Sequence, residues 1–157
     1  KFGKKPANLY LQGETGLGKT FLSTSIAKVV SETGFSVVYD TAADIFARFE
    51  SEKFSKTENM ETVQSDVRRY LTCDLLIIDD LGTEMATSFV TSALYYLINT
   101  RLLSGKSTII SSNLTPDDVG ERYSQQIASR IGGEYTVLRF YGDDIRRTKK
   151  RSEENGD

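Results

Sequence analysis

Short runs of apolar residues alternate along the chain with longer segments in which apolar positions recur every three or four residues. The short runs fit buried strands, and the longer segments fit amphipathic helices. Strands are predicted at Asn8–Gln12, Ser36–Asp40, Leu75–Asp79, Thr108–Ser112 and Thr136–Phe140. Because regular alternation of strands and helices is typical of α/β domains, we predict a five-stranded parallel sheet.

Five helices are predicted between these strands. Their expected ranges are Lys19–Thr33, Ala42–Phe54, Thr62–Thr72, Thr87–Ser104 and Pro116–Ile131. The start of the last one is well defined, because Thr115 offers a cap, Pro116 suits the first turn and Asp118 can reach back to the cap. Gly105 and Gly132 stand where helices are expected to stop.

The region from Ala42 to Thr72 is longer than a minimal crossover between parallel strands requires. We therefore expect an extra pair of helices between the second and third strands. The apolar residues expected to face the body of the domain are Phe46, Phe49, Phe54 and Val67. The basic residues expected on the outward side are Lys53, Lys56, Arg68 and Arg69.

Length and composition describe one folded domain. The chain has 157 residues, of which 38% are hydrophobic and 27% charged. No apolar run approaches the roughly 20 residues needed to cross a membrane. Since the first residue is Lys1, we expect a fragment of a longer protein that lacks an N-terminal partner-binding domain. The charged tail at 148–157 is expected to be disordered.

Residue usage excludes several kinds of chemistry. The chain has no histidine, which removes His-based catalysis and typical zinc sites. Its single cysteine, Cys73, allows no internal disulfide and favours a reducing, cytoplasmic setting. The net charge of −2 provides no global attraction to nucleic acid, so any such binding needs a local basic patch.

A glycine-rich motif lies between the first strand and the first helix. The residues Gly13, Glu14, Thr15, Gly16, Leu17, Gly18, Lys19 and Thr20 match G-x-x-x-x-G-K-[ST]. Backbone N–H groups and the helix N-terminus would bind phosphates, Lys19 would reach the β- and γ-phosphates of ATP, and Thr20 would ligate Mg²⁺. Phe21 completes the predicted nucleotide-binding set. A chance glycine-rich turn is the alternative, and the strand–loop–helix context disfavours it.

The third strand runs into acids in the stretch LLIIDDLGTE. Asp79 falls at the carboxyl end of the strand, where a P-loop protein needs a second group beside Mg²⁺. Asp80 would then orient the attacking water. The alternative for both acids is an ordinary transition from strand to loop. Glu84 is expected to cap the helix near Thr87 or to contact a neighbour.

Two further polar residues are candidates. Asn113 follows the fourth strand and would bind the γ-phosphate and the water, although it could also cap a turn. Arg130 precedes two glycines. It could interact with its own helix dipole or act as an arginine finger on the neighbouring subunit, and spacing alone does not decide between them.

The order of these motifs resembles an AAA+ ATPase, and more narrowly the DnaC/DnaI-type helicase loaders and the IstB-like transposition ATPases. The segments that carry the resemblance are NLYLQGETGLGKTFL, LLIIDDLGTE, LLSGKSTIISSNLTPDD and IASRIGGEYTVLRFYGDDIR. It covers about residues 7–147. It implies a three-layer P-loop NTPase in which Lys19 and Thr20 bind the phosphates and Mg²⁺, Asp79 and Asp80 serve metal and water, Asn113 is a sensor and Arg130 is the trans finger.

The chain departs from a full AAA+ module at its end. Arg146 matches an arginine of the family and would be a second sensor, but little chain follows it, so no full helical lid is expected. Asp80 stands where many AAA+ proteins have Glu, which implies slow hydrolysis. The extra helices resemble an insertion that lines a path for single-stranded DNA. The cluster RRTKKR at 146–151 could bind DNA or remain a solvated tail.

The resemblance implies an ATPase that forms homo-oligomers through Arg130 and helps to place a hexameric DnaB-type replicative helicase on single-stranded DNA. An IstB-like transposition helper is the main alternative. A small-molecule P-loop kinase is disfavoured, because no arginine-bearing lid is evident. A nucleotide switch without hydrolysis stays open, since Asp80 replaces Glu. A GTPase is disfavoured, because SNLTPDD supplies no N-K-x-D motif.

Overall fold

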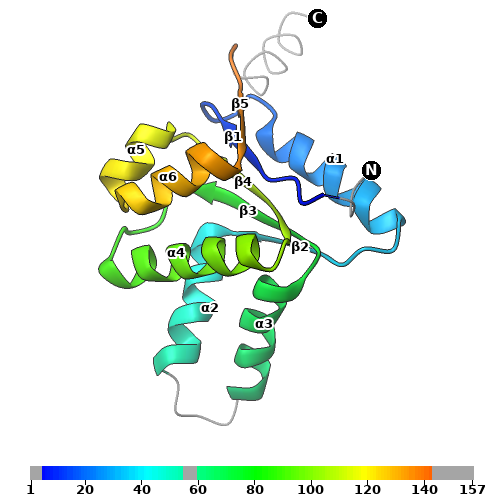
Figure 1. The fold of residues 1–157 in the computed structure, drawn as a ribbon, viewed down its shortest axis with the longest axis vertical. Helices are drawn as coiled ribbons and strands as arrows, with labels where there is room; N and C mark the ends of the chain where they lie inside the picture. Colours follow the sequence, from blue (N-terminus) through cyan, green and yellow to red (C-terminus); the bar gives the residue numbers. More distant parts are fainter. Residues whose placement is uncertain (1–4, 55–59, 143–157) are drawn as a thin grey trace, which may run out of the picture.

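The computed structural model describes the backbone of residues 5–54 and 60–142 and the side chains of these residues except 60–63. Five strands and six helices alternate in this part of the chain (Figure 1). The strands are β1 (Leu9–Gln12), β2 (Val37–Thr41), β3 (Leu75–Leu81), β4 (Ser107–Ser112) and β5 (Thr136–Arg139). The helices are α1 (Lys19–Glu32), α2 (Ala42–Phe54), α3 (Met60–Thr72), α4 (Ser88–Leu103), α5 (Pro116–Arg122) and α6 (Gln125–Glu134).

The strands form one sheet in the order β2-β3-β4-β1-β5, and every pair is parallel. This confirms the five-stranded parallel sheet. Because all strands run the same way, their carboxyl ends meet at one edge, which is where parallel sheets bind ligands. Gly13 and Asn113 directly follow β1 and β4, and Asp80 is the second-last residue of β3, so all three lie at this edge.

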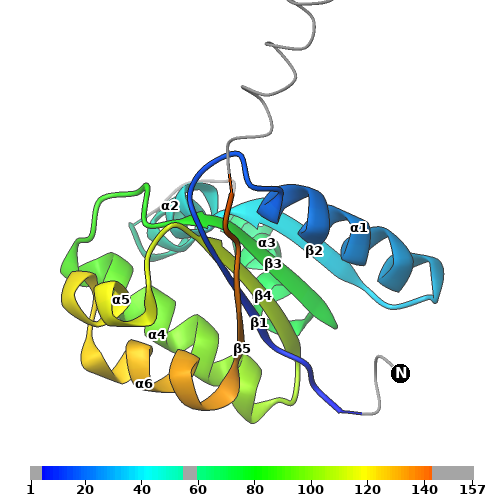
Figure 2. The ribbon, with the colours of Figure 1, turned by 90° about the horizontal axis from the view of Figure 1, so that it is seen from above.

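Helices cover both faces of the sheet, unequally. Among the described helices, only α1 covers one face (Figure 2), where it packs over the apolar side chains of Leu11, Leu75, Ile77 and Ile109. The larger core on the other face is built from the remaining helices, with Leu76, Ile78 and Ile110 at its centre. Strand β3 is therefore buried on both faces, which explains its continuous apolar sequence.

The inserted helix pair, α2 and α3, extends away from the sheet below α4 (Figure 1). The rings of Phe49 and Tyr70 stack between the two helices with centroids 6.4 Å apart, and Arg48 pairs with Asp66 at 3.5 Å. The insertion between strands two and three is confirmed. Of the four apolar residues expected to face the body, Phe46, Phe49 and Val67 are buried.

The expectation for Phe54 is wrong. Its side chain is 63% exposed, because it lies in the last turn of α2, beyond the reach of the sheet, and packs against Phe89 of α4. Among the basic residues expected on the outward side, Lys53, Arg68 and Arg69 are exposed. Lys56 lies outside the described residues.

The helix expected over 116–131 is two helices. Ser124 interrupts it, since its hydroxyl accepts a hydrogen bond from Ile127 N at 3.2 Å and so begins α6. The capping box of Thr115 and Asp118 at the start of α5 is confirmed, and so is the stop before Gly105. Gly132 does not end its helix. It lies inside α6, which continues to Glu134 because burial of Ile127 and Ile131 outweighs the roughly 1 kcal/mol cost of a helical glycine.

No helix in the described ranges is long and apolar enough to cross a membrane.

Candidate functional site

The glycine-rich loop is held close to two neighbouring segments. Gly13 N donates a hydrogen bond to Ser112 O at 3.1 Å, which ties the loop to the end of β4. A side chain at Gly13 would meet Phe140 at 2.8 Å, so only glycine fits there. Gly16 and Gly18 have φ angles of 84° and 96°, a conformation that other residues rarely adopt. The loop therefore needs glycine at these three positions.

The N-terminus of α1 is open toward the loop. Its cap is Gly18, which supplies no side-chain hydrogen bond, and no acid lies in the first turn. By contrast, α4, α5 and α6 are each capped by the hydroxyl of a Thr or Ser. The free N–H groups and positive dipole end of α1 are those that phosphate binds. These features fit a nucleotide.

Lys19 fills the centre of this loop. Its side chain is buried, and its ammonium donates hydrogen bonds to Gly13 O and to Glu14 O, the latter at 2.7 Å. Burial lowers the pKa of the Lys19 ammonium, while the carboxylates of Asp80, Asp79 and Glu14 oppose that shift. An ammonium group held by the carbonyl oxygens of the glycine-rich loop is placed to bind phosphate oxygens.

Asp79 is buried at the end of β3 among three hydroxyl groups. Thr20 Oγ1 lies 3.2 Å from its Oδ2, Tyr39 OH donates to the same oxygen, and Ser111 Oγ donates to Oδ1. The structure thus brings Thr20 and Asp79 together, as the sequence predicts. A hydroxyl and a carboxylate beside a phosphate loop are the usual protein ligands of Mg²⁺ in P-loop proteins, so they fit that ion.

Tyr39 and Ser111 were not expected from the sequence. Tyr39 comes from β2 and Ser111 from β4, the two strands that flank β3. Burial, followed by the bond to Asp79, raises the pKa of Tyr39. The sequence offers only their position in the carboxyl-terminal halves of predicted strands, and the order of the strands in the sheet decides that both strands flank β3.

Asp80 lies at the rim of the cavity above the loop. This cavity has a volume of about 590 Å³ and is lined by Thr15, Gly16, Gly18, Lys19, Thr20, Phe21, Thr24, Asp80 and Thr83. Asp80 has a φ of 54°, the only non-glycine residue with positive φ in the described part of the chain. Strain of this kind concentrates at functional sites. Phe21 also lines the cavity and is 77% exposed.

Glu84 does not cap α4, whose cap is Thr87. Its Oε2 accepts a hydrogen bond from Gly82 N at 3.0 Å, and its Oε1 accepts one from the hydroxyl of Tyr123. Arg122 donates to the backbone oxygen of Glu84. Glu84 therefore fastens the loop after β3 to the end of α5 instead of reaching the cavity.

Asn113 follows β4 directly and is exposed beside the loop after β3. A side chain added at Gly82 would stand 3.6 Å from Asn113 Oδ1. Asn113 thus lies beside Gly82, and its contact with a γ-phosphate stays a prediction.

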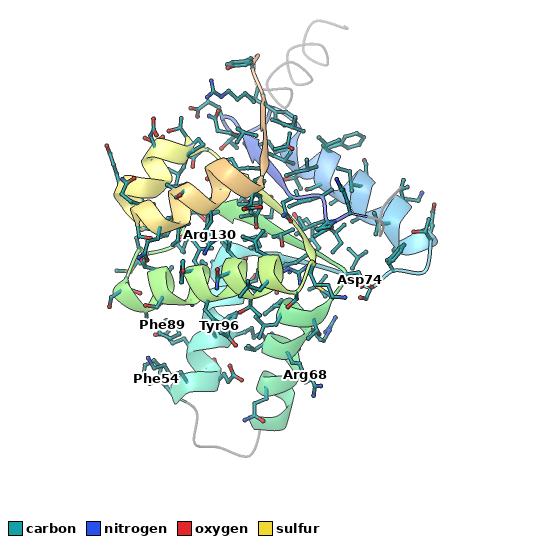
Figure 3. The ribbon with its side chains drawn as sticks, in the orientation of Figure 1. Phe54, Arg68, Asp74, Phe89, Tyr96 and Arg130 are labelled. Atoms are coloured by element: carbon teal, nitrogen blue, oxygen red, sulfur yellow. The ribbon has the colours of Figure 1, made fainter. Side chains whose placement is uncertain are left out.

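Arg130 lies at the other end of the strands. It lines a cavity of about 250 Å³ with Pro6, Asn8, Asn99, Leu102, Leu103 and Glu134, on the face that α4 and α6 cover (Figure 3). The four residues of β1 separate Asn8 from Gly13, a span of roughly 15 Å. Arg130 therefore stays apart from the phosphate loop of its own chain. Arg146 lies outside the described residues, as does the basic cluster at 146–151.

A third cavity, of about 580 Å³, opens between α2 and α4. Its lining includes Phe54, Phe89, Tyr96 and Lys53, and we call these four residues the aromatic groove. The rings of Phe54 and Phe89 are tilted at 51° with centroids 5.9 Å apart, and Lys53 Nζ lies 5.5 and 5.1 Å from them (Figure 3). The rings of Phe54 and Tyr96 are 63% and 53% exposed, whereas Phe89 is partly buried against the core.

Comparison with known proteins agrees with the resemblance noted in the sequence. The family model of the IstB-like ATP binding protein matches residues 1–152. The chain is 28% identical over 123 residues to the replicative helicase loader DnaI of Bacillus subtilis (strain 168), covering 76% of this chain and 37% of DnaI. It is 25% identical over 154 residues to the replicative helicase loader DnaC of Buchnera aphidicola subsp. Acyrthosiphon pisum (strain APS), covering 98% of this chain and 62% of DnaC.

The fold is also found among solved structures. That of the replication initiator DnaA bound to AMPPCP and single-stranded DNA is similar, with a TM-score of 0.75, 24% identity and coverage of 98% of this chain and 47% of that one. The chain spans less than two thirds of the length of the DnaI and DnaC relatives.

Proposed function

Because the chain belongs to the family of IstB-like ATP binding proteins, we propose that it is the AAA+ ATPase domain of a DnaC/DnaI-type helicase loader that acts in DNA replication in the cytoplasm. One observation carries the proposal. Lys19 in the glycine-rich loop, Thr20 and Asp80 line one cavity at the carboxyl edge of the sheet, and Thr20 contacts the buried Asp79 directly beneath it.

ATP is the nucleotide that we propose for this cavity. The N–H groups of the loop and of the first turn of α1 bind the β- and γ-phosphates, and Lys19 turns from the carbonyls of Gly13 and Glu14 to a phosphate oxygen. Thr20 and Asp79 would hold Mg²⁺, which would supply positive charge to neutralise the phosphates.

Asp80 orients the water that attacks the γ-phosphate. Its position at the cavity rim and its strained backbone support this role. Asn113, on the neighbouring loop, holds the γ-phosphate or the same water. A carboxylate one carbon shorter than Glu reaches the water less well, so we expect hydrolysis to be slow.

The site is completed by a second copy of the chain. Arg130 is exposed and shares a cavity with Asn8, at the end of β1 opposite to its own phosphate loop, which supports a role on the ATP of a neighbouring subunit. Such an arginine stabilises the charge of the transition state.

The aromatic groove is proposed to contact single-stranded DNA. Bases stack on exposed aromatic rings, and a nearby cation attracts the backbone, whatever the base sequence. Phe54, Phe89 and Tyr96 supply the rings, and Lys53 supplies the cation. Arg68 and Arg69 lie on the adjacent helix α3, both exposed.

A transposition helper is the second candidate, because the matching family model is that of an IstB-like protein. Both candidates use the same ATPase chemistry and differ in partner. Size-exclusion chromatography of the chain with a DnaB-type hexamer, and separately with the transposase of an insertion sequence, distinguishes them by which mixture elutes as a complex.

The ATPase proposal is tested by measuring phosphate release with and without Mg²⁺ and single-stranded DNA. We expect Mg²⁺-dependent turnover in the wild type and none in Lys19→Ala, which removes the phosphate-binding cation. A wild-type chain that binds ATP but releases no phosphate under any of these conditions would support the non-hydrolysing switch instead. A chain that binds no ATP would contradict the proposal altogether.

A further inference from the structure

Ser111 contacts both of the acids that end β3. Its side chain is fully buried in β4. The hydroxyl donates a hydrogen bond to Asp79 Oδ1 and accepts one from Asp80 N at 3.1 Å. A serine hydroxyl has one hydrogen to donate and two lone pairs, so both contacts can exist together.

This double contact arises from an irregularity in the pairing of β3 with β4. Ile78 is registered with Ile110, but Leu81, three residues further on, is registered with Ser112, only two residues further on. Asp79 and Asp80 therefore stand together opposite Ser111, which is the arrangement of a β-bulge.

The bulge decides where the two carboxylates point. In a regular strand, consecutive side chains project to opposite faces of the sheet. Here Asp79 contacts Thr20 at the start of α1, and Asp80 lines the cavity over the same loop. Asp80 reaches it with a φ of 54°, so the bulge brings both acids to one site at the cost of a strained backbone.

We propose that Ser111 is a positioning residue of the ATPase site, which holds this bulge so that Asp79 faces the metal and Asp80 faces the water. The inference rests on the proposed ATPase function. Ser111 is not among the residues that line the cavity. Its single hydroxyl joins the two acids, because it donates to the carboxylate of Asp79 and accepts from the backbone N–H of Asp80.

Two residues near Ser111 offer matched comparisons. Ser112 is equally buried in the same strand, but its hydroxyl donates to Leu81 O and accepts from Leu114 N, away from both acids. Tyr39 donates its hydroxyl hydrogen to Asp79. Removing the hydroxyl of Tyr39 therefore tests an effect on Asp79, and removing that of Ser111 tests an effect on both acids. Removing that of Ser112 tests the general effect of losing a buried hydrogen bond.

Two quantities are measured on Ser111→Ala, Tyr39→Phe and Ser112→Ala. The first is the Mg²⁺ concentration that half-saturates binding of a fluorescent, non-hydrolysable ATP analogue. The second is kcat at saturating Mg²⁺ and ATP. For Ser111→Ala we expect about a 10- to 100-fold rise in the first and a similar fall in the second, the range typical of groups that orient metal ligands.

Tyr39→Phe should raise only the Mg²⁺ requirement, because Asp80 keeps its backbone contact. Ser112→Ala should change neither quantity by more than about twofold, although its melting temperature should fall. Ser111→Thr, which keeps the hydroxyl, should restore both quantities toward the wild type.

Circular dichroism checks folding. If Ser111→Ala does not fold, Ser111→Cys, with a weak donor of similar size, is expected to show the same two effects.

The proposal is overturned if a folded Ser111→Ala or Ser111→Cys chain behaves like Ser112→Ala in both measurements. It is also overturned if Ser111 variants shift the Mg²⁺ requirement alone, since that would make Ser111 equivalent to Tyr39. These failures differ from failure of the ATPase proposal, in which the wild type itself does not bind the analogue with Mg²⁺.

Discussion

The hydroxyl of Tyr123 donates a hydrogen bond to the carboxylate of Glu84, and this contact joins the loop after β3 to the end of α5. The second carboxylate oxygen of Glu84 accepts from Gly82 N at 3.0 Å. Burial, and then the bond to Glu84, raises the pKa of Tyr123. Both oxygens of Glu84 are thus in use outside the cavity, which leaves Asp80 as the acid at its rim.

We predict that Asp80→Asn keeps ATP binding but lowers turnover about 100-fold or more, because an amide cannot polarise the attacking water. Glu84→Gln should retain most of the turnover and lose about 1 kcal/mol of stability, through its weakened bond to Tyr123. Phosphate release and urea unfolding measure the two effects. The assignment is wrong if Glu84→Gln stops turnover while Asp80→Asn does not.

For Arg130→Ala we predict about a 1,000-fold loss of turnover with ATP affinity nearly unchanged, because the proposed role of this arginine is to stabilise the transition state in a neighbouring subunit. A mixing experiment identifies the trans arrangement. Arg130→Ala supplies an intact phosphate loop and Lys19→Ala an intact arginine, so the mixture should regain activity that neither variant has alone. Gln126→Ala, a nearby change on α6, is the control and should act like the wild type. A mixture as inactive as its components would argue against the finger.

The aromatic groove gives a prediction about DNA. Phe54→Ala and Phe89→Ala should each weaken binding of a fluorescent oligothymidine by about 5- to 150-fold, the value of one lost stacking contact. Lys53→Ala should weaken it less and reduce the dependence of log affinity on log salt concentration by about one unit. Fluorescence anisotropy at several salt concentrations measures both. Leu103→Ala removes another exposed apolar side chain, 81% exposed at the end of α4, and should have no effect. If Leu103→Ala and Phe54→Ala weaken oligothymidine binding equally, the aromatic groove does not contact the DNA.

Arg101 is predicted to be a main support of the fold. It is fully buried, and it donates to Tyr70 O at 2.7 Å, to Ser107 O at 2.6 Å and to Thr108 Oγ1 at 2.9 Å. Arg101→Ala leaves a cavity and unpaired carbonyl groups, so we expect a loss of about 3 kcal/mol or more in urea unfolding.

The control for this prediction is Arg48→Ala, which removes an exposed arginine paired with Asp66. Its cost should stay below about 1 kcal/mol. Similar costs for the two variants would show that the buried contacts of Arg101 add no more than a surface ion pair.

Asp74 gives a prediction about pH. Lys106 at 2.8 Å and the N–H and hydroxyl of Ser36 lower the pKa of this carboxyl to about 2. Because the folded pKa lies below the unfolded value, the stabilisation is complete above about pH 4 and is lost as pH falls toward 2. Asp74→Asn should therefore be less stable than the wild type at pH 6, with a difference that shrinks between pH 4 and pH 2. Thermal unfolding at several pH values measures it, and a difference independent of pH would contradict the assigned cause.

The sequence by itself determined the sheet, most element boundaries and the family. Apolar runs such as LLII predict a buried strand, and the spacing of Gly13, Gly18 and Lys19 predicts the phosphate loop, because these signals depend on residues close together in the chain. The meeting of Thr20 with Asp79 also followed, since parallel strands end at one edge. Local signals were misread at Gly132 and Phe54, where packing of α6 and the position of α4 decided the outcome.

Only the tertiary structure decided what surrounds the two acids. Tyr39, Ser111 and Asp79 are distant in sequence, and nothing local predicts that their hydroxyls and carboxylate meet. The bulge at Asp79 and Asp80 depends on how β3 is registered with β4, and register is a property of paired strands. The place of Arg130, away from its own phosphate loop, likewise follows from the docking of α6. Sequence patterns report the periodicity of one segment, whereas a site is built from contacts between segments, which only packing fixes.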